Sequence, residues 1–328
     1  MKHYIVRFSL HSSILSPFQS DIIFGHLAWG WRYLNGEEAL RELIDSLDAS
    51  PVLISDAFPY GKLPKPILPP VPISRQNAQA LESSRNNGKY SKAGMVKALT
   101  RFKEMKSITY ISAESLATLR SNLSCTTIIN NLADEKEEMK IPMMEEVVGH
   151  NTINRATGMV AKAGGFHPQI ETFYPNGCEF WCWIAGDYWN KEDLTALWEY
   201  IENSGFGADS SIGKGRIKVE SIEEAELEIP EGANAVMSLS TFIPADNCPT
   251  VVDYDSLIKF GRLGSIYANR KDFYKSALLM LKPGSIIKTE WKPEVPLGKT
   301  VKNVHWDTGI VHYGHIFPYP VKIAEGEL

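Results

Sequence analysis

The chain has 328 residues, of which 44% are hydrophobic and 22% are charged. This composition is typical of a soluble globular protein with a buried core, and the length suits two domains, or one domain with a large insertion. The formal net charge of −5 argues against a uniformly basic nucleic-acid binder. The sequence lacks a run of about 18 apolar residues, so we expect no membrane span. Four cysteines without a dense framework indicate reduced thiols and a cytoplasmic location.

The charge is unevenly distributed along the chain. Between Tyr60 and Lys106, ten Lys and Arg residues are balanced only by Glu82 and Glu104, so this stretch carries +8 and the rest of the chain −13. A charge run of this kind is either a solvated insertion or a binding surface, and the pattern leaves both interpretations open.

The first part of the chain contains clear signals for one strand and two helices. Residues 3–10 alternate like a strand, which makes a signal peptide improbable there. Residues 20–34 have the apolar spacing of a helix with Ser20 as N-cap, and a second short helix is predicted over 37–47. The following segment, SDAFPYGKLPKPILPPVPIS, is too rich in proline for a helix or a central strand. We interpret residues 50–165 as a large insertion.

Regular structure resumes near residue 166. Two strand-like runs flank Pro175-Asn176-Gly177, and Asn-Gly is a strong hairpin signal. The second run, CEFWCWIA, is apolar on both faces, which predicts a central strand with one face against a partner. Residues 190–204 predict a helix with Asn190 as N-cap and Gly205 as its stop, and GRIKVESI predicts another strand.

The resulting order of strand, helix, insertion, two strands, helix and strand is that of a ferredoxin-like (RRM-like) domain. We therefore predict an α+β protein whose N-terminal domain covers residues 1–230 and carries the insertion at about 50–165. Residues 231–328 would form a second domain, with a helix over 269–282 (NRKDFYKSALLMLK).

The glycine segment GFGADSSIGKGRIKVE, residues 205–220, does not fit a nucleotide-binding loop. A P-loop requires Ser or Thr after the lysine, where Gly215 stands, and a dinucleotide loop requires a glycine at Ser210. Both of those loops also lead into a helix N-terminus, whereas this one leaves a helix C-terminus. Two interpretations stay open: a tight turn with solvated cations, or a polynucleotide contact in which bare glycine amides and neighbouring cations hold phosphates.

Five motifs then occur in a characteristic order: SDIIFGHLAWGW, ISDAFPYGKLPKPILP, HNTINRATGMVAKAGGFH, GFGADSSIGKGRIKV and VHYGHIFPYPVKI. Together they resemble the repeat-associated mysterious protein (RAMP) superfamily, and within it the subunits that cap the crRNA 5′ end in type III-A CRISPR (Csm) effector complexes. The resemblance spans essentially the whole chain except residues 64–149. It implies two ferredoxin-like domains and non-catalytic binding of the 5′ repeat-derived handle of crRNA, with no cofactor or metal.

The same resemblance implies docking to the large polymerase-like subunit and to the first backbone RAMP subunit, with target RNA contacted only indirectly. Its motifs also supply the candidate RNA contacts. In the glycine segment these are Gly205, Gly207, Ser210, Ser211, Gly213, Lys214, Gly215 and Arg216. The candidates elsewhere are Ser20, Lys65, Asn151, Asn154, Arg155 and Lys162. An asparagine amide can donate and accept, so it can contact base edges or 2′-hydroxyls.

Three other functions compete with this interpretation. Some RAMP proteins cleave RNA without metal through a histidine, and His26 lies in the first predicted helix, although a satisfied structural histidine beside Trp29 is the favoured interpretation. His305, His312 and His315 are predicted not to share a metal ion. A pure scaffold protein, or the equivalent subunit of a type III-B or III-D complex, is also compatible with the sequence.

Overall fold

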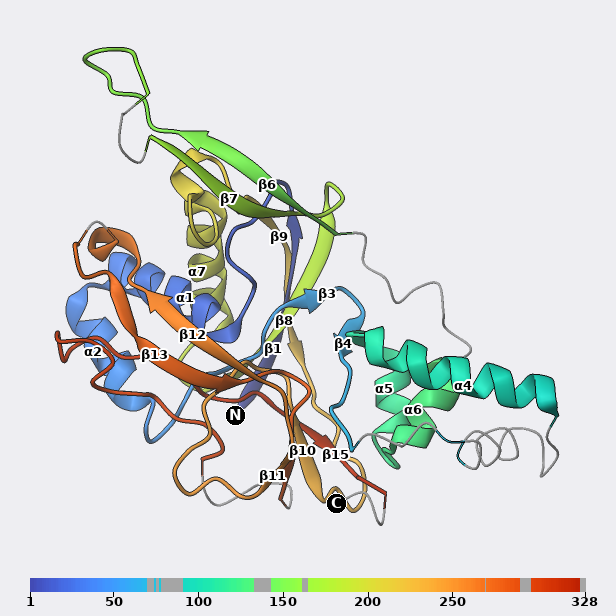
Figure 1. Cartoon of the computed structure of the whole chain (residues 1–328). Helices are drawn as coiled ribbons and strands as arrows, with labels where there is room; N and C mark the ends of the chain where they lie inside the picture. The colour runs from blue at the N-terminus through green and yellow to red at the C-terminus, as the bar shows by residue number, and fades with distance from the viewer. Residues whose placement is uncertain are drawn as a thin grey trace.

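The structure is a computed structural model that describes residues 1–69, 74, 77, 91–132, 143–160, 165–268, 270–289 and 296–324. The chain is an α+β protein built from antiparallel sheets (Figure 1). Among these described residues, no helix combines the length and the apolar character needed to cross a membrane.

The first sheet has the strand order β2-β8-β1-β9, and the short strand β3 also pairs with β8. All of these pairs are antiparallel. The strand bounds are β1 Lys2–Leu10, β2 Leu53–Ile54, β3 Phe58–Pro59, β8 Cys178–Gly186 and β9 Ile217–Ala225. The first, central and last strands of this sheet are those predicted, but β2 and β3 take the place of the strand predicted just before the Asn-Gly turn. Because β2 and β3 belong to this sheet, the insertion begins after residue 59 rather than at residue 50.

Three helices accompany this sheet: α1 (Ser20–Asn35), α2 (Glu37–Ser46) and α7 (Lys191–Ser204). Helix α1 begins at Ser20 with Gln19 as its N-cap, one residue earlier than predicted. Helix α7 has the predicted ends, with a capping box between Asn190 and Asp193 and Gly205 at its C-cap. Both helices bury apolar side chains in the same core as β1 and β8, at Ile23, Phe24, Leu27, Leu194, Leu197, Trp198 and Ile201.

Strand β8 is central, as its two apolar faces predicted. One face, with Phe180, lies in the core beneath α1 and α7. The other carries Trp181 and Trp183, and the Trp183 ring lies 5.9 Å from that of Phe317, which belongs to the second half of the chain. The face that was expected to meet a partner is therefore covered by the protein itself.

The Asn-Gly turn joins β7 to β8 without forming the predicted hairpin between them. Strand β7 (Phe166–Phe173) pairs instead with β6 (Met144–Asn151). Strand β8 is already paired with β1 on one side and with β2 and β3 on the other, so it has no free edge for β7. Hairpin β6–β7 projects from the body and ends in a loop (Figure 1).

The insertion contains a helical unit at one end of the molecule (Figure 1). Its elements are β4 Lys62–Pro64, α4 Lys92–Ser107, β5 Tyr110–Ser112, α5 Ala113–Leu119 and α6 Cys125–Leu132. Leu116 of α5 and Ile128 of α6 share a buried cluster with Met237 and Phe317, so the unit is part of the core. In α4 the side chains of Lys92, Lys97 and Lys103 are exposed, which agrees with both interpretations of the basic stretch.

The second half of the chain is built from strands. A four-stranded sheet has the order β11-β14-β10-β15, and β12 and β13 form a separate ribbon. The bounds are β10 Ala235–Ser238, β11 Val251–Asp253, β12 Ser256–Arg262, β13 Tyr274–Leu281, β14 Ile286–Lys288 and β15 Pro318–Val321.

The helix predicted over 269–282 is wrong, because residues 274–281 form β13. The spacing of its apolar residues fits a helix. The segment is nevertheless a strand, because it pairs with β12 and buries Met280 and Leu281. The described residues after 230 form no α-helix, so a second ferredoxin-like domain is not confirmed.

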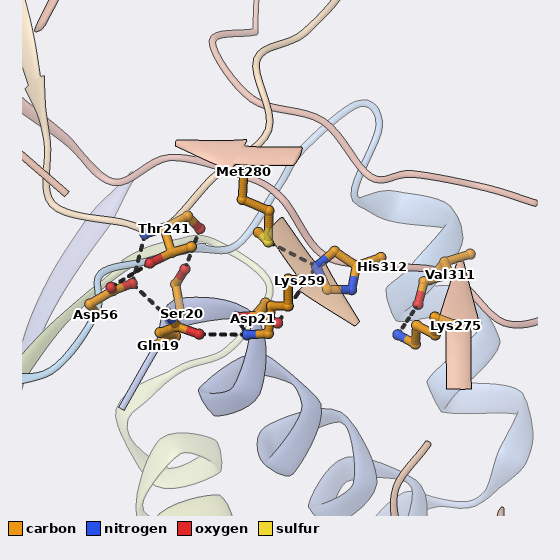
Figure 2. A network of polar contacts seen from close by, with 10 residues as sticks. All are labelled: Gln19, Ser20, Asp21, Asp56, Thr241, Lys259, Lys275, Met280, Val311 and His312. Atoms are coloured by element: carbon orange, nitrogen blue, oxygen red, sulfur yellow. Dashed lines mark hydrogen bonds and ion pairs between the residues drawn. The ribbon is translucent and has the colours of Figure 1, made fainter. Parts of the chain in front are cut away.

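A buried polar network joins the start of α1 to the second half of the chain (Figure 2). The carboxylate of Asp56 accepts from the backbone N–H of Ser20 at 2.8 Å and from the N–H and hydroxyl of Thr241 at 2.7 Å. Burial raises the pKa of Asp56 to about 6. Beside it, Asp21 forms an ion pair with Lys259 at 2.6 Å. Asp56 of the SDAFP motif thus has a structural role, between the two short strands β2 and β3 that pair with β8.

Candidate nucleic-acid interface

The glycine segment folds into a tight turn between α7 and β9. All four of its glycines have positive φ, from +62° at Gly215 to +93° at Gly213. A Cβ at Gly215 would lie 1.8 Å from the carbonyl oxygen of Phe206, and one at Gly207 would lie 2.7 Å from Cβ of Ser16. These two glycines therefore permit close packing of the chain against itself.

Most backbone N–H groups of the turn donate within the protein. Phe206 donates to the carbonyl of Gly215, and Gly215 donates to the carbonyl of Ser13. Internal acceptors are likewise present for the N–H groups of Gly207, Ala208, Ile212, Gly213, Lys214 and Arg216. The expectation that bare glycine amides hold phosphates is corrected, since these amides hold the turn together.

His26 supports the turn from helix α1. Its Nε2 accepts the N–H of Gly207 at 2.8 Å, and its ring stacks on Phe206 with the centroids 4.7 Å apart. Burial lowers the pKa of His26 to about 4, so the ring is neutral at pH 7. A neutral imidazole whose Nε2 lone pair is already occupied is a structural contact, and this geometry disfavours a catalytic base.

Lys214 forms an ion pair and is not a solvated cation. Its ammonium donates to Oε2 of Glu171 in β7 at 2.5 Å and approaches the Ser13 hydroxyl at 3.2 Å. The Glu171 side chain is 0% exposed and also accepts from the Ser13 hydroxyl at 2.6 Å and from His150 at 3.1 Å. Burial alone would raise the pKa of Glu171, but these three partners hold it below its ordinary value.

The segment 12–16, between β1 and α1, connects the turn to the hairpin. On one side its groups accept hydrogen bonds from the turn: Ser12 Oγ from Arg216, and Ser16 Oγ from Ala208. On the other side Ile14 pairs with Thr172 of β7 through two hydrogen bonds of 2.9 and 3.0 Å. Two motifs about 50 residues apart in the sequence are thereby brought together.

The far end of the hairpin carries three of the predicted contacts, Asn151 as the last residue of β6 and the other two in the loop. Asn151, Asn154 and Arg155 are all exposed. Asn154 also shapes the loop, because its side-chain oxygen accepts the N–H of Ala156 at 2.9 Å. Lys162 lies outside the described residues. The exposed amides and the guanidinium at this tip can reach a ligand without rearrangement of the fold.

The hairpin also exposes an apolar face that the sequence analysis missed. Val147, Ile170 and Phe166 lie on one face and are 71%, 63% and 65% exposed. Ile153 and Met159 continue the exposed apolar surface in the loop. The alternation Phe166, Pro168, Ile170, Thr172 was the available signal, but this strand was expected to pair with the next one, and its true partner β6 lies in the segment interpreted as an insertion.

Two predicted contacts lie away from this surface. Ser20 is fully buried, and its hydroxyl donates to the carbonyl of Thr241 at 2.7 Å. The ammonium of Lys65 donates to the carbonyl of Met105 at 2.6 Å, near the C-terminal end of α4. Both side chains are occupied by structural contacts in the protein, so we correct the prediction that they belong to the RNA surface.

The predicted contacts of the glycine segment differ in their exposure. Gly205 and Gly215 are buried, while Gly207, Ser210 and Lys214 are half-buried. The exposed residues are Ser211, Gly213 and Arg216. Any ligand therefore meets mainly the hydroxyl of Ser211 and the guanidinium of Arg216 at the turn.

Two of the C-terminal histidines make structural contacts inside the protein. His312 and His315 are buried, and the Nε2 atom of His315 lies 2.9 Å from the hydroxyl of Thr300. Within the described ranges, no three His, Cys, Asp or Glu side chains gather in a way that could hold a metal ion.

No protein-family model and no curated protein matches the sequence. Solved structures do. A chain of the Csm1–Csm4 cassette in complex with AMPPNP matches with a TM-score of 0.57 and 17% identity, over 98% of this chain and 100% of that one. A chain of the Csm3–Csm4 subcomplex of the type III-A CRISPR-Cas interference complex matches with a TM-score of 0.55 and 18% identity, over the same shares.

The chain has the fold of these CRISPR subunits. A chain of the Csm1–Csm4 cassette with cA3 gives a TM-score of 0.56 at 18% identity. Csm4 is the component that these complexes have in common, so the fold is Csm4-like, in agreement with the RAMP resemblance of the motifs. The Csm4-like fold extends over nearly the whole chain.

Proposed function

We propose that this chain is the subunit of a type III-A CRISPR effector complex that binds the 5′ repeat-derived handle of crRNA, and that it is not catalytic. The observation that carries the proposal is the connection of the two motifs. The glycine turn and hairpin β6–β7 meet at segment 12–16, and each exposes an arginine, Arg216 and Arg155.

The chemistry of these two elements suits single-stranded RNA. Guanidinium groups contact phosphates, and the amides of Asn151 and Asn154 can contact base edges or 2′-hydroxyls. The exposed Phe166, Val147 and Ile170 offer apolar surface on which unstacked bases can pack. The turn supplies a positive charge for phosphates, and the hairpin supplies groups that can contact bases. This combination is typical of sheet-based RNA-binding proteins.

Docking to other subunits belongs to the same proposal. The structural neighbours come from complexes with Csm1 and with Csm3, and we propose the large polymerase-like subunit and the first backbone subunit as partners of this chain. The ribbon β12–β13 supports protein contact, because Ile258, Phe260 and Leu279 are exposed on one of its faces.

The RNA-binding proposal is tested by charge reversal at exposed arginines. We expect Arg155→Glu and Arg216→Glu each to weaken binding of handle RNA by about tenfold. Each should also reduce the slope of log affinity against log salt concentration by about one, because one phosphate contact is lost. Lys288→Glu, at an exposed position in β14 of the other sheet, is the matched control. Affinities are measured by fluorescence anisotropy at several salt concentrations.

If both arginine variants bind handle RNA with the affinity of the control, the proposal fails. Lys214→Glu is unsuitable for this test. It would place a second carboxylate beside the buried Glu171 and damage the fold rather than the RNA surface.

The absence of catalysis is tested separately. The purified chain is incubated with repeat RNA in the presence of a chelator, with His26→Ala alongside. We expect no cleavage by either protein. Cleavage by the wild type that His26→Ala abolishes would replace the proposal with a metal-independent RAMP endonuclease.

Partner docking is tested by co-expression with the large and backbone subunits of a type III-A complex. Phe260→Glu introduces a charge into the apolar face of the ribbon, and Lys282→Glu changes an exposed cation just beyond β13 as a control. We expect Phe260→Glu to reduce recovery of one partner while RNA binding by the isolated chain is retained. Unchanged recovery of both partners would exclude this face.

A further inference from the structure

We propose that Glu171 is a positioning residue that holds the glycine turn and hairpin β6–β7 in one orientation, so that RNA meets them as a single rigid surface. This inference rests on the proposed function, because it concerns how that RNA surface is assembled. It assigns to a buried carboxylate a role in binding geometry rather than a contact with RNA.

Three donors from different parts of the chain converge on Glu171. Lys214 comes from the glycine turn, Ser13 from the segment after β1, and His150 from β6. The carboxylate itself belongs to β7 and has no exposed surface. A single side chain therefore contacts every element that has to keep its place for the turn and the hairpin to be aligned.

Apart from Tyr174, which follows β7 and packs against Phe180 in the core, the hairpin has little other attachment at this joint. In the described part of the chain, β6 and β7 pair in a sheet only with each other, and one bridge, Ile14 with Thr172, links them to the body through the backbone. Thr172 is adjacent to Glu171, so the bridge and the carboxylate act at the same place. A long projection held at one narrow joint can change its angle unless directional contacts oppose this.

The ion pair between the buried Glu171 and the half-buried Lys214 fixes an orientation more than it adds stability. Removing two charges from water offsets most of their attraction, so well-packed apolar side chains could hold this joint equally firmly. Hydrogen bonds to a carboxylate, by contrast, require the donor groups to lie at defined distances and angles from its oxygens. The use of Glu171 with Lys214, Ser13 and His150 is therefore best explained by a requirement for a defined orientation.

The consequence concerns simultaneous binding. Arg216 on the turn and Arg155 on the hairpin tip can contact one RNA molecule together only while their elements stay aligned. Pre-alignment lowers the entropy lost on binding and so increases affinity. Without this alignment, contacts with the hairpin add little affinity for RNA that is already bound at the turn.

The test compares the effect of Arg155→Glu in two backgrounds, wild type and Glu171→Gln. Binding of a labelled single-stranded handle RNA to the full-length chain is measured for all four proteins. In the wild-type background we expect Arg155→Glu to weaken binding by about tenfold. In the Glu171→Gln background we expect binding to be weaker already, by about tenfold, and Arg155→Glu to add less than about twofold.

Two further variants separate orientation from folding. Glu145→Gln removes an exposed carboxylate from the same hairpin and should leave the effect of Arg155→Glu unchanged. Glu171→Gln with Lys214→Met removes both charges of the ion pair, so it should melt closer to the wild type than Glu171→Gln alone does, while the loss of coupling to Arg155 persists. Thermal unfolding by circular dichroism is recorded for each protein.

The outcomes distinguish the inference from the proposed function. If Arg155→Glu and Arg216→Glu leave wild-type binding unchanged, the proposed function fails, and the inference with it. If they weaken binding but Arg155→Glu keeps its full effect beside Glu171→Gln, only the inference is overturned. Unfolding of both Glu171 variants would show that the residue is required for the fold and would also overturn the positioning role.

Discussion

Two glycines of the turn, Gly213 and Gly215, have the same sign of φ but different surroundings. A Cβ at Gly213 would meet open space, with no atom of the described structure within 4 Å. At Gly215 it would overlap the carbonyl oxygen of Phe206 at 1.8 Å, and that carbonyl belongs to the backbone. The first position needs glycine only for its φ, and the second also needs it for space.

This difference predicts unequal effects of alanine at the two positions. Gly213→Ala should lower the free energy of unfolding by about 1 kcal/mol, the usual cost of a left-handed backbone with a Cβ. Gly215→Ala should lower it by more than about 3 kcal/mol, because the backbone of the turn has to move. Urea unfolding of both variants measures the difference, and equal effects would contradict the close packing seen at Gly215.

At the scale of elements, helix α7 and the hairpin differ in how their local sequences determine them. Helix α7 carries its own start and stop signals, with Asn190 accepting from the N–H of Asp193 at 2.9 Å and Gly205 at the C-cap. Hairpin β6–β7 has no comparable signal, and it forms because β8 is fully paired elsewhere. The first element could be predicted from a local pattern and the second could not.

The N-cap of α7 gives a prediction at this scale. Asn190→Ala removes the side-chain acceptor from the first turn and should lower the free energy of unfolding by about 1 kcal/mol. Asn203→Ala, at an exposed position in the last turn of the same helix, is the control and should cost clearly less. Thermal unfolding monitored by circular dichroism compares them, and equal losses would contradict the capping role.

At the scale of the whole molecule, buried ionisable groups concentrate where the two halves of the chain meet. His312 lies 3.6 Å from Asp21 of α1, and Asp56 receives its bonds from Ser20 and Thr241. Burial lowers the pKa values of His312 and His315 to about 4 and raises that of Asp56 to about 6. The junction is therefore assembled with neutral histidines.

These shifts predict a loss of stability in acid. A histidine whose folded pKa lies below its unfolded value stabilises the protein fully above pH 6.5 and loses this contribution as the pH falls toward 4. Between pH 7.5 and pH 5, His312 and His315 should each cost up to about 2 kcal/mol of unfolding free energy. Asp56 acts in the opposite direction, because its raised pKa favours the folded state at lower pH, by about 1 kcal/mol.

The net expectation is therefore acid destabilisation of the junction. Urea unfolding at pH 7.5 and pH 5 measures it, and His315→Gln should show a smaller difference between the two values than the wild type. A stability that is equal at both pH values, or an unchanged difference in His315→Gln, would contradict the buried neutral state of these rings.

The sequence by itself determined the elements whose signals are local. These include the first strand, the two-faced central strand β8, the ends of α7 and the glycine turn, and also the motifs that resemble RAMP proteins. Each depends on side-chain periodicity or on backbone requirements within a few residues. Their order predicted β1, β8 and β9 of the first sheet, but not β2 and β3, which lie in the segment interpreted as an insertion.

Tertiary structure alone decided what those elements contact. Residues 274–281 form a strand because β12 lies beside them, and hairpin β6–β7 forms because β8 has no free edge. The local sequence around Lys214 does not show that it forms an ion pair. Its partner is the carboxylate of Glu171, 43 residues away in the sequence. Pairing and burial depend on groups that are distant in sequence, and no local pattern records which of them will meet.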